Sequence, residues 1–238
     1  MFILICVLWF GMAGCGEDKS PTSHSETYLF KITLDPTSTE INLGTLPTYT
    51  LENEKAVRIS ELVDTNTITE PDNFAYRLVG SDGFYAHSKG NPDNTWSHIQ
   101  KGYIILSTMK VLFDSDLGIL SRYNIKDASE MKILRKIDFV TPSDSLIQNI
   151  VDELPHVVFQ DSLNAVALEK LFPADAVDDP STLTYQLIAY DDYSVTLAWE
   201  QVLEGFYVID QDRVLYSNPD NPGKMKVTKL NRLVAQKP

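Results

Sequence analysis

The chain has 238 residues, of which 33 are acidic and 20 are basic, so its formal net charge at pH 7 is -13. A net charge of this sign disfavours attraction to nucleic-acid phosphates, and we expect no nucleic-acid partner. Hydrophobic residues make up 43% and aromatic residues 10% of the sequence, which is too apolar for a disordered chain. The length allows one large domain or two small ones, each able to bury a core.

The N-terminus is typical of a secreted bacterial lipoprotein. Residues Met1–Phe10 are almost wholly apolar, and this run is shorter than the roughly 20 residues that span a bilayer. The tetrad Met12-Ala13-Gly14-Cys15 resembles the bacterial lipobox, although Met stands where Leu is usual and no Lys or Arg precedes the apolar run. The resemblance implies cleavage of a signal peptide at 1–14 and acylation of Cys15, with palmitate for example. An ordinary secretory signal with an incidental cysteine is the alternative.

The lipobox predicts the location of the protein. Two or three acyl chains, at about 0.8 kcal/mol per buried methylene, would anchor Cys15 stably in a lipid bilayer. Residues 15–27 would hold this cysteine and a flexible polar tether. The acids Glu17 and Asp18 resemble the surface-export signals of some lipoproteins. We therefore expect an extracytoplasmic protein, in the outer membrane or at the cell surface rather than in the inner membrane.

The same order of features occurs twice along the chain. A strand-like run, a turn, a segment with a tryptophan and a glycine follow one another around Tyr76 and again around Tyr185, 109 positions later. Trp96 and Trp199 are 103 positions apart, so the first copy carries six extra residues before its tryptophan. The sequence thus predicts two tandem repeats, at 28–139 and 140–238.

Periodicity predicts mainly strands in both repeats, and hence an α+β fold of mixed, mainly β units with short helices. The strands expected in the first repeat are 28–34, 47–51, 74–79, 103–106, 111–113 and 131–139. Those expected in the second are 157–159, 183–189, 206–209, 214–216 and 225–234. Helices are expected at 57–63 and 166–172 and around each tryptophan.

Local patterns also predict the environment of particular side chains. The strands expected at 131–139 and 225–234 alternate basic and apolar residues, which places their charges on the water face. Trp96 and Trp199 each have an apolar residue three positions later, which favours packing in the core. Gly102 and Gly205 suit the left-handed residue just past a helix end.

Four short segments resemble the C-terminal half of the oxidoreductase molybdopterin-binding domain, the sulfite-oxidase-like family. They are the turn Ser81-Asp82-Gly83-Phe84, the segment Trp96–Gly102, the run Tyr103–Leu106 and the closing strand from Lys132 to Ile137. The second repeat matches more loosely, with Asp192 in place of the turn glycine. The resemblance implies a duplicated molybdopterin-binding-domain-like fold.

The resemblance also implies where a cofactor would bind. The candidate contact residues are Asp82, Gly83, Arg122 and Lys126. In the family's enzymes a cysteine thiolate commonly binds the molybdenum, but the only cysteines of this chain are Cys6, within the signal peptide, and Cys15. We therefore expect no cofactor, and keep a bound molybdopterin as the alternative.

No motif in the sequence predicts a catalytic or metal site. The four histidines lie singly, without the paired spacing of zinc ligands, and no nucleophile elbow or phosphate-binding loop occurs. Three hypotheses follow: a membrane-anchored lipoprotein with a non-catalytic binding or scaffold role, a molybdopterin-dependent oxidoreductase or electron-transfer accessory, and an extracytoplasmic receptor for a small ligand or carbohydrate. The partner of the first, a protein or small ligand, is not specified by the sequence.

Overall fold

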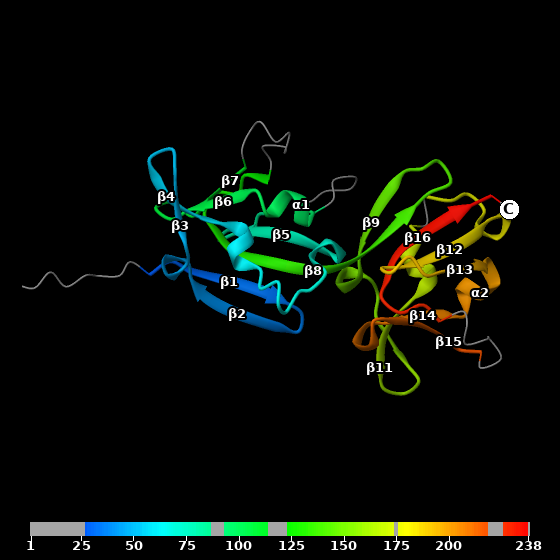
Figure 1. Ribbon diagram of the computed structural model, residues 1–238. Helices are drawn as coiled ribbons and strands as arrows, with labels where there is room; N and C mark the ends of the chain where they lie inside the picture. The colour runs from blue at the N-terminus through cyan, green and yellow to red at the C-terminus, as the bar shows by residue number, and fades with distance from the viewer. Residues whose placement is uncertain (1–26, 87–92, 114–122, 174–175, 219–225, 238) are drawn as a thin grey trace, which may run out of the picture.

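The computed structural model describes residues 27–86, 93–113, 123–173, 176–218 and 226–237 (Figure 1). This part of the chain is mainly β, which confirms the expected mixed, strand-rich class. Its α-helices are single short turns, α1 (Trp96–Ile99) and α2 (Trp199–Leu203). None of the helices in the described ranges is long and apolar enough to cross a membrane.

The largest sheet in the described part of the chain has eight strands. Six of them follow one another in the order β13, β12, β16, β8, β1, β2, and both β5 and β9 pair with β8. Their bounds are β1 Leu29–Leu34, β2 Thr37–Asn42, β5 Phe74–Gly80, β8 Ala128–Val140, β9 Leu146–Ile150, β12 Thr184–Ala189, β13 Ser194–Ala198 and β16 Leu230–Gln236.

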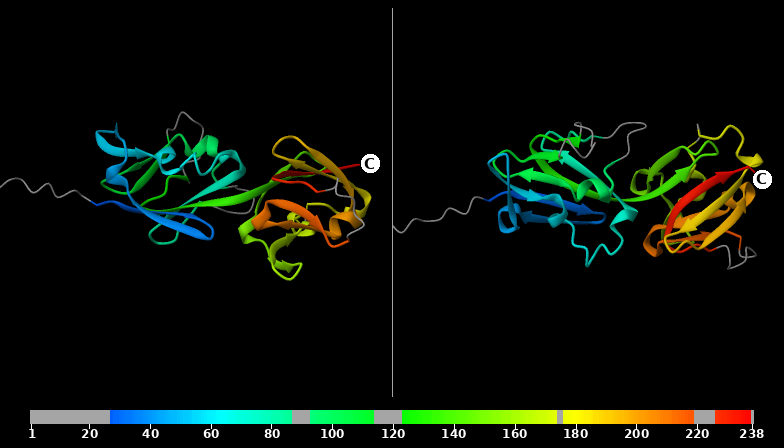
Figure 2. Two further views of the ribbon diagram at one scale, coloured as in Figure 1. Left: turned by 60° about the horizontal axis from the view of Figure 1, so that its bottom comes forward. Right: turned by 45° about the horizontal axis from the view of Figure 1, so that its top comes forward.

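Strand β8 belongs to two halves of the molecule, which we define as residues 27–135 and 136–237. Up to Arg135 it pairs in parallel with β1 and antiparallel with β5. From Lys136 onward it pairs antiparallel with β9, and Arg232 of β16 lies opposite Asp138 in a parallel pair. Both views in Figure 2 show β8 running out of the first half and into the second. One continuous strand therefore connects the halves.

Each half completes its core with a small four-stranded sheet. In the described residues these sheets have the orders β3, β4, β6, β7 and β10, β11, β14, β15. Their bounds are β3 Thr48–Leu51, β4 Glu54–Arg58, β6 Gly102–Ile105, β7 Lys110–Phe113, β10 Val157–Phe159, β11 Leu163–Ala167, β14 Gly205–Val208 and β15 Arg213–Tyr216. In the first core Val57 and Ile104 of the small sheet pack with Tyr76 of the large sheet, and in the second Val166 and Tyr207 pack with Tyr185. Burial of apolar surface between sheets is the main stabilising contribution.

The helices predicted at 57–63 and 166–172 are wrong in type. The first residues of each segment lie in β4 and β11, and single 3-10 turns follow, η2 (Ile59–Leu62) and η7 (Leu168–Leu171). Segments this short do not nucleate an α-helix, because the first helical turn fixes several residues for a single hydrogen bond. Pairing with β6 and β14 instead satisfies the backbone. The other 3-10 turns are η1 (Leu43–Thr45), η3 (Pro71–Asn73), η6 (Val151–Glu153), η8 (Pro180–Thr182) and η9 (Ile209–Gln211).

Gly102 and Gly205 do not cap helices in the left-handed conformation, which corrects the prediction. They begin β6 and β14, and neither has a positive φ angle. A Cβ atom on Gly102 would lie 2.6 Å from Ile59 Cδ1, and one on Gly205 would lie 2.4 Å from Leu168 Cδ1. Each glycine is there because a side chain of a 3-10 turn packs directly on its backbone.

Candidate functional site

The predicted cofactor residues Asp82 and Gly83 form a tight turn at the end of β5. Asp82 Oδ1 accepts a hydrogen bond from the backbone N–H of Phe84 at 2.9 Å, and the N–H of Gly83 donates to Gly80 O at 2.9 Å. Gly83 has a φ of +81°, which a residue with a side chain rarely adopts. Both residues are exposed, and the contacts of Asp82 and Gly83 shape the turn itself.

The structure brings Lys126 close to this turn. Ser81 N–H donates to Asp127 O at 2.8 Å, so the loop before β8 lies against the end of β5. Lys126 is exposed, and its neighbour Asp127 and the turn residue Asp82 are both acidic. An anionic cofactor would therefore meet little positive charge here. Arg122 and Cys15 lie outside the described residues.

A turn with the same hydrogen bonds ends β12 in the second half. Tyr193 N–H donates to Asp191 Oδ1 at 3.2 Å, and Tyr190 N–H donates to Lys229 O at 3.0 Å. Asp192 occupies the left-handed position with a φ of +64°. Asp tolerates this conformation better than most residues do, since its short side chain bonds to nearby backbone groups.

Both tryptophans pack against the cores, as predicted. The Trp96 ring lies 5.7 Å from the Tyr76 ring, and the Trp199 ring lies 5.4 Å from the Tyr185 ring. The two tyrosine hydroxyls donate in the same way to proline carbonyls, each at 2.9 Å, from Tyr76 to Pro71 and from Tyr185 to Pro180. These contacts favour a structural role for the tryptophans over ligand stacking.

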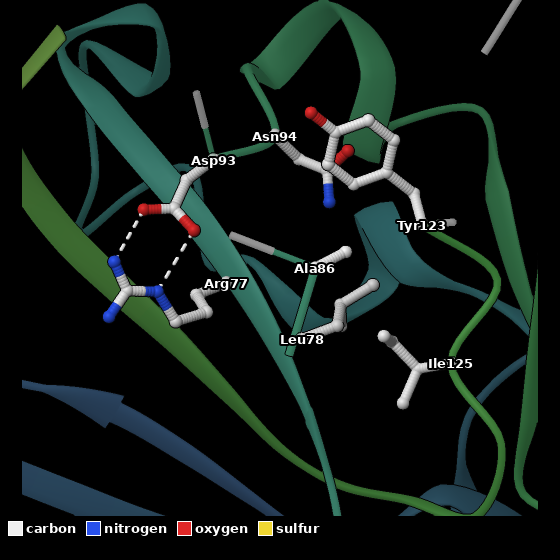
Figure 3. A pocket seen from close by; sticks show the side chains of 7 residues that line it. All are labelled: Arg77, Leu78, Ala86, Asp93, Asn94, Tyr123 and Ile125. Carbon is white, nitrogen blue, oxygen red and sulfur yellow. Dashed lines mark hydrogen bonds and ion pairs between the residues drawn. The ribbon is translucent and has the colours of Figure 1, made fainter. Parts of the chain in front are cut away.

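A buried ion pair within the first half, Arg77 with Asp93, has further contacts that reach the second half (Figure 3). Arg77 of β5 donates through Nε to Asp93 Oδ1 at 2.9 Å and through Nη2 to Asp93 Oδ2 at 2.6 Å. Its Nη1 contacts Glu153 in η6, and the Asp93 N–H donates to Gln148 of β9 at 2.9 Å. Burial lowers the pKa of Arg77, but the hydrogen bonds that its guanidinium donates to Asp93 and Glu153 outweigh this effect and raise the pKa above its ordinary value.

This cluster does not form a binding site. The side chains of Arg77 and Asp93 are 6% and 1% exposed. The hollow beside them in Figure 3 is filled by its own lining residues, among them Leu78 and Ile125. The cluster therefore positions the two halves. Sequence reasoning missed it because its residues lie at distant positions and match no motif.

A second hollow, which we call the cleft, has a volume of about 220 Å³ and lies between the halves. One wall comes from the first half, the other comes from the second, and β8 contributes the residues between them. The lining residues are Leu34, Thr67, Ile68, Thr69, Glu70, Asn73, Phe74, Arg135, Lys136, Tyr207, Asp212, Lys229 and Leu230.

Arg135 lies on the core face of β8 at the junction of the two halves. Alternate residues of a strand share one face, and here Ile133 packs in the first core whereas Ile137 packs in the second. Arg135 lies between them and donates through Nη1 to Ile209 O at 2.9 Å. The predicted placement of all β8 charges on the water face is therefore wrong, and the buried pair Lys136 and Asp138, 2.9 Å apart, is a further exception. The reason is that β8 is the central strand and is covered on both sides.

The cleft contains one ion pair and one hydrogen bond from a phenol to a carboxylate. Lys229 Nζ lies 2.9 Å from Glu70 Oε1 and bridges the two walls. The buried Tyr207 hydroxyl donates to Asp212 Oδ1 at 2.6 Å. Burial raises the pKa of Tyr207 well above its usual range, and Asp212 raises it further, so this phenol stays protonated as a donor. The lining thus contains three cationic residues, Arg135, Lys136 and Lys229, and the carboxylates of Glu70 and Asp212, and the Lys136 ammonium is paired with Asp138.

No known protein family, curated protein or solved structure matches this chain. In the described ranges, no three His, Cys, Asp or Glu side chains gather as a metal site would require. The resemblance to the molybdopterin-binding domain stays a prediction. The cleft, which the sequence did not predict, is the candidate site that the geometry favours.

Proposed function

We propose that this chain is a bacterial lipoprotein, anchored outside the cytoplasm through acylated Cys15, whose body is a non-catalytic binding module. The observation that supports a binding role is the cleft, because it is concave, has walls from both halves and contains charged groups at defined positions. The N-terminal tetrad ending at Cys15 supports the anchor. The absence of a cysteine beyond Cys15 supports the view that no thiolate-bound molybdenum is used.

We further propose that the halves arose by duplication of a molybdopterin-binding-domain-like unit, with repeats at 28–139 and 140–238. Matched features support this origin: the two turns that end β5 and β12, the tyrosine hydroxyls on proline carbonyls, and the glycines under η2 and η7. A cleft arises where two such units meet through unlike surfaces. Binding would then be a property of the pair rather than of one unit.

The anchor is tested by metabolic labelling with an alkyne analogue of palmitate in a bacterial host. We expect the wild-type protein to be labelled and to sediment with membranes, and Cys15→Ala to lose both properties. Cys6→Ala is the matched control, because Cys6 lies within the predicted signal peptide and its loss should leave labelling intact. Equal labelling of Cys15→Ala and wild type would contradict the proposal.

The non-catalytic role is tested by elemental analysis and native mass spectrometry of the full protein from a host that makes molybdopterin. We expect a polypeptide without stoichiometric molybdenum or pterin. Stoichiometric molybdenum would instead support the oxidoreductase or electron-transfer hypothesis. A carbohydrate receptor that stacks sugars on Trp96 and Trp199 is less well supported, because both rings pack on core tyrosines.

A further inference from the structure

We propose that the cleft binds a small zwitterion, a free α-amino acid with an apolar side chain, through its carboxylate at Arg135 and its ammonium group at the Glu70 wall. This inference rests on the proposed binding function and names the ligand class.

The bonding of Arg135 points to a carboxylate. A guanidinium has five N–H donors, and that of Arg135 makes one hydrogen bond within the described residues, to Ile209 O at 2.9 Å. A half-buried guanidinium with donors to spare binds a planar carboxylate with two parallel hydrogen bonds. Arg135 is half-buried and lines the cleft.

The carboxylates in the lining, Glu70 from the first half and Asp212 from the second, point to an ammonium group. Glu70 and Asp212 place two carboxylates in the lining, against the cations Arg135 and Lys229. The Lys229 side chain is 52% exposed and that of Glu70 is 26% exposed, so water already competes for their ion pair. An ammonium group that enters the cleft would be a second cationic partner for Glu70. Asp212 would keep the hydrogen bond that it accepts from the Tyr207 hydroxyl.

Charge balance and size narrow the ligand further. With Lys136 neutralised by Asp138, two positive and two negative side chains remain in the lining, and they favour a ligand that carries one charge of each sign over a simple anion or cation. A volume of about 220 Å³ lies below the roughly 300–1,000 Å³ typical of sites for drug-sized ligands and suits a ligand as small as an amino acid. The apolar side chains in the lining suit an aliphatic side chain; they are Leu34, Ile68, Phe74 and Leu230.

The test is isothermal titration calorimetry of the full protein in detergent micelles with three matched probes. L-Valine carries both charges, isovalerate lacks the amine, and isobutylamine lacks the carboxylate. We expect one L-valine per chain, and affinities at least tenfold lower for each of the other two. Isovalerate binding as tightly as L-valine would overturn the zwitterion and leave a binding protein of another class. No heat with any probe would overturn the inference without bearing on the lipid anchor.

Variants locate the site. Arg135→Met and Glu70→Gln should each lower L-valine affinity at least tenfold. Arg135→Lys keeps the charge but not the planar fork, and should fall between wild type and Arg135→Met even if Arg135→Met folds poorly. Arg232→Met is the matched control, since Arg232 is exposed on β16 and does not line the cleft. Unchanged affinity in Arg135→Lys and Glu70→Gln would place binding elsewhere and overturn the proposal.

Discussion

Arg77 is the residue whose replacement should damage the fold most through charge. Its guanidinium neutralises Asp93, whose side chain is 1% exposed. In Arg77→Met the carboxylate would stay buried without a partner, and we expect a loss of about 3–5 kcal/mol in the free energy of unfolding, measured by urea denaturation. The double variant Arg77→Met, Asp93→Leu should recover most of this loss. A single variant as stable as wild type would show that water reaches Asp93.

Asp152 should make stability fall as pH rises through the acidic range. Burial raises its pKa above the ordinary 3.8, and this outweighs the opposing hydrogen bond from Arg135 N–H. The folded state therefore binds the Asp152 proton more tightly than the unfolded state does. The stabilisation from this proton is fully present below pH 3.8 and is lost as pH rises through the folded-state pKa. The melting temperature of Asp152→Asn minus that of wild type should therefore be larger at pH 7 than at pH 3.

Asp64 provides a control of opposite sign for that titration. Hydrogen bonds from the Thr67 hydroxyl and the Asn66 N–H lower its pKa, so its contribution is present above the ordinary pKa of 3.8 and lost as pH falls. Asp64→Asn should therefore lose melting temperature relative to wild type at pH 7 and approach it at pH 3. If the melting temperatures of wild type and both variants changed with pH by the same amount, these assignments would be contradicted.

The turns after β5 and β12 should respond oppositely to substitution, although they share hydrogen bonds. Gly83→Ala places a side chain at a φ of +81° and should destabilise the protein by about 1–2 kcal/mol in chemical denaturation. Asp192→Gly relieves the same strain at a φ of +64° and should leave stability equal or higher. Gly83→Asn is the control, because Asn adopts this region readily. Equal losses in Gly83→Ala and Gly83→Asn would attribute the effect to side-chain volume instead.

Some elements could be predicted from the sequence and others could not, for physical reasons. Strands β5 and β8 have long apolar runs or alternations, and both were predicted. Strands β2, β9 and β13 were not predicted. Strand β2 is largely polar and exposed, the short edge strand β13 has only one buried residue, and β9 begins in solvent. Arg135 lies in an alternation of basic and apolar residues that is typical of a strand with a solvent-exposed face. Its position between the two cores therefore became clear only from the structure.

The candidate site was harder to predict than the fold. Sequence resemblance directed attention to Asp82, Gly83 and Lys126, which do lie together but at an exposed turn. The cleft is built from residues as distant in sequence as Leu34 and Lys229. No local spacing links such residues, because the register of β8 with β1 and β16 brings them together.

The whole molecule should unfold as one cooperative unit despite its two cores. A strand shared between both halves, together with the Arg77 cluster, couples their stability. Differential scanning calorimetry should show one transition with equal calorimetric and van't Hoff enthalpies. Glu153→Gln and Glu70→Gln remove ion pairs between the halves and should lower the melting temperature while keeping a single peak, since β8 remains. Two separated peaks in the wild type would contradict the coupling.

The parallel pairing of β1 with β8 also has a mechanical consequence. Residues Lys31–Leu34 lie alongside Glu130–Ile133 in the same direction. A pull on the chain before β1, opposed by a pull on the second half through the end of β8, would slide the two strands past each other. All hydrogen bonds between β1 and β8 would then bear the force at the same time, in shear, instead of breaking one after another. A protein tethered at its N-terminus and loaded at its far half would therefore resist force at its first strand.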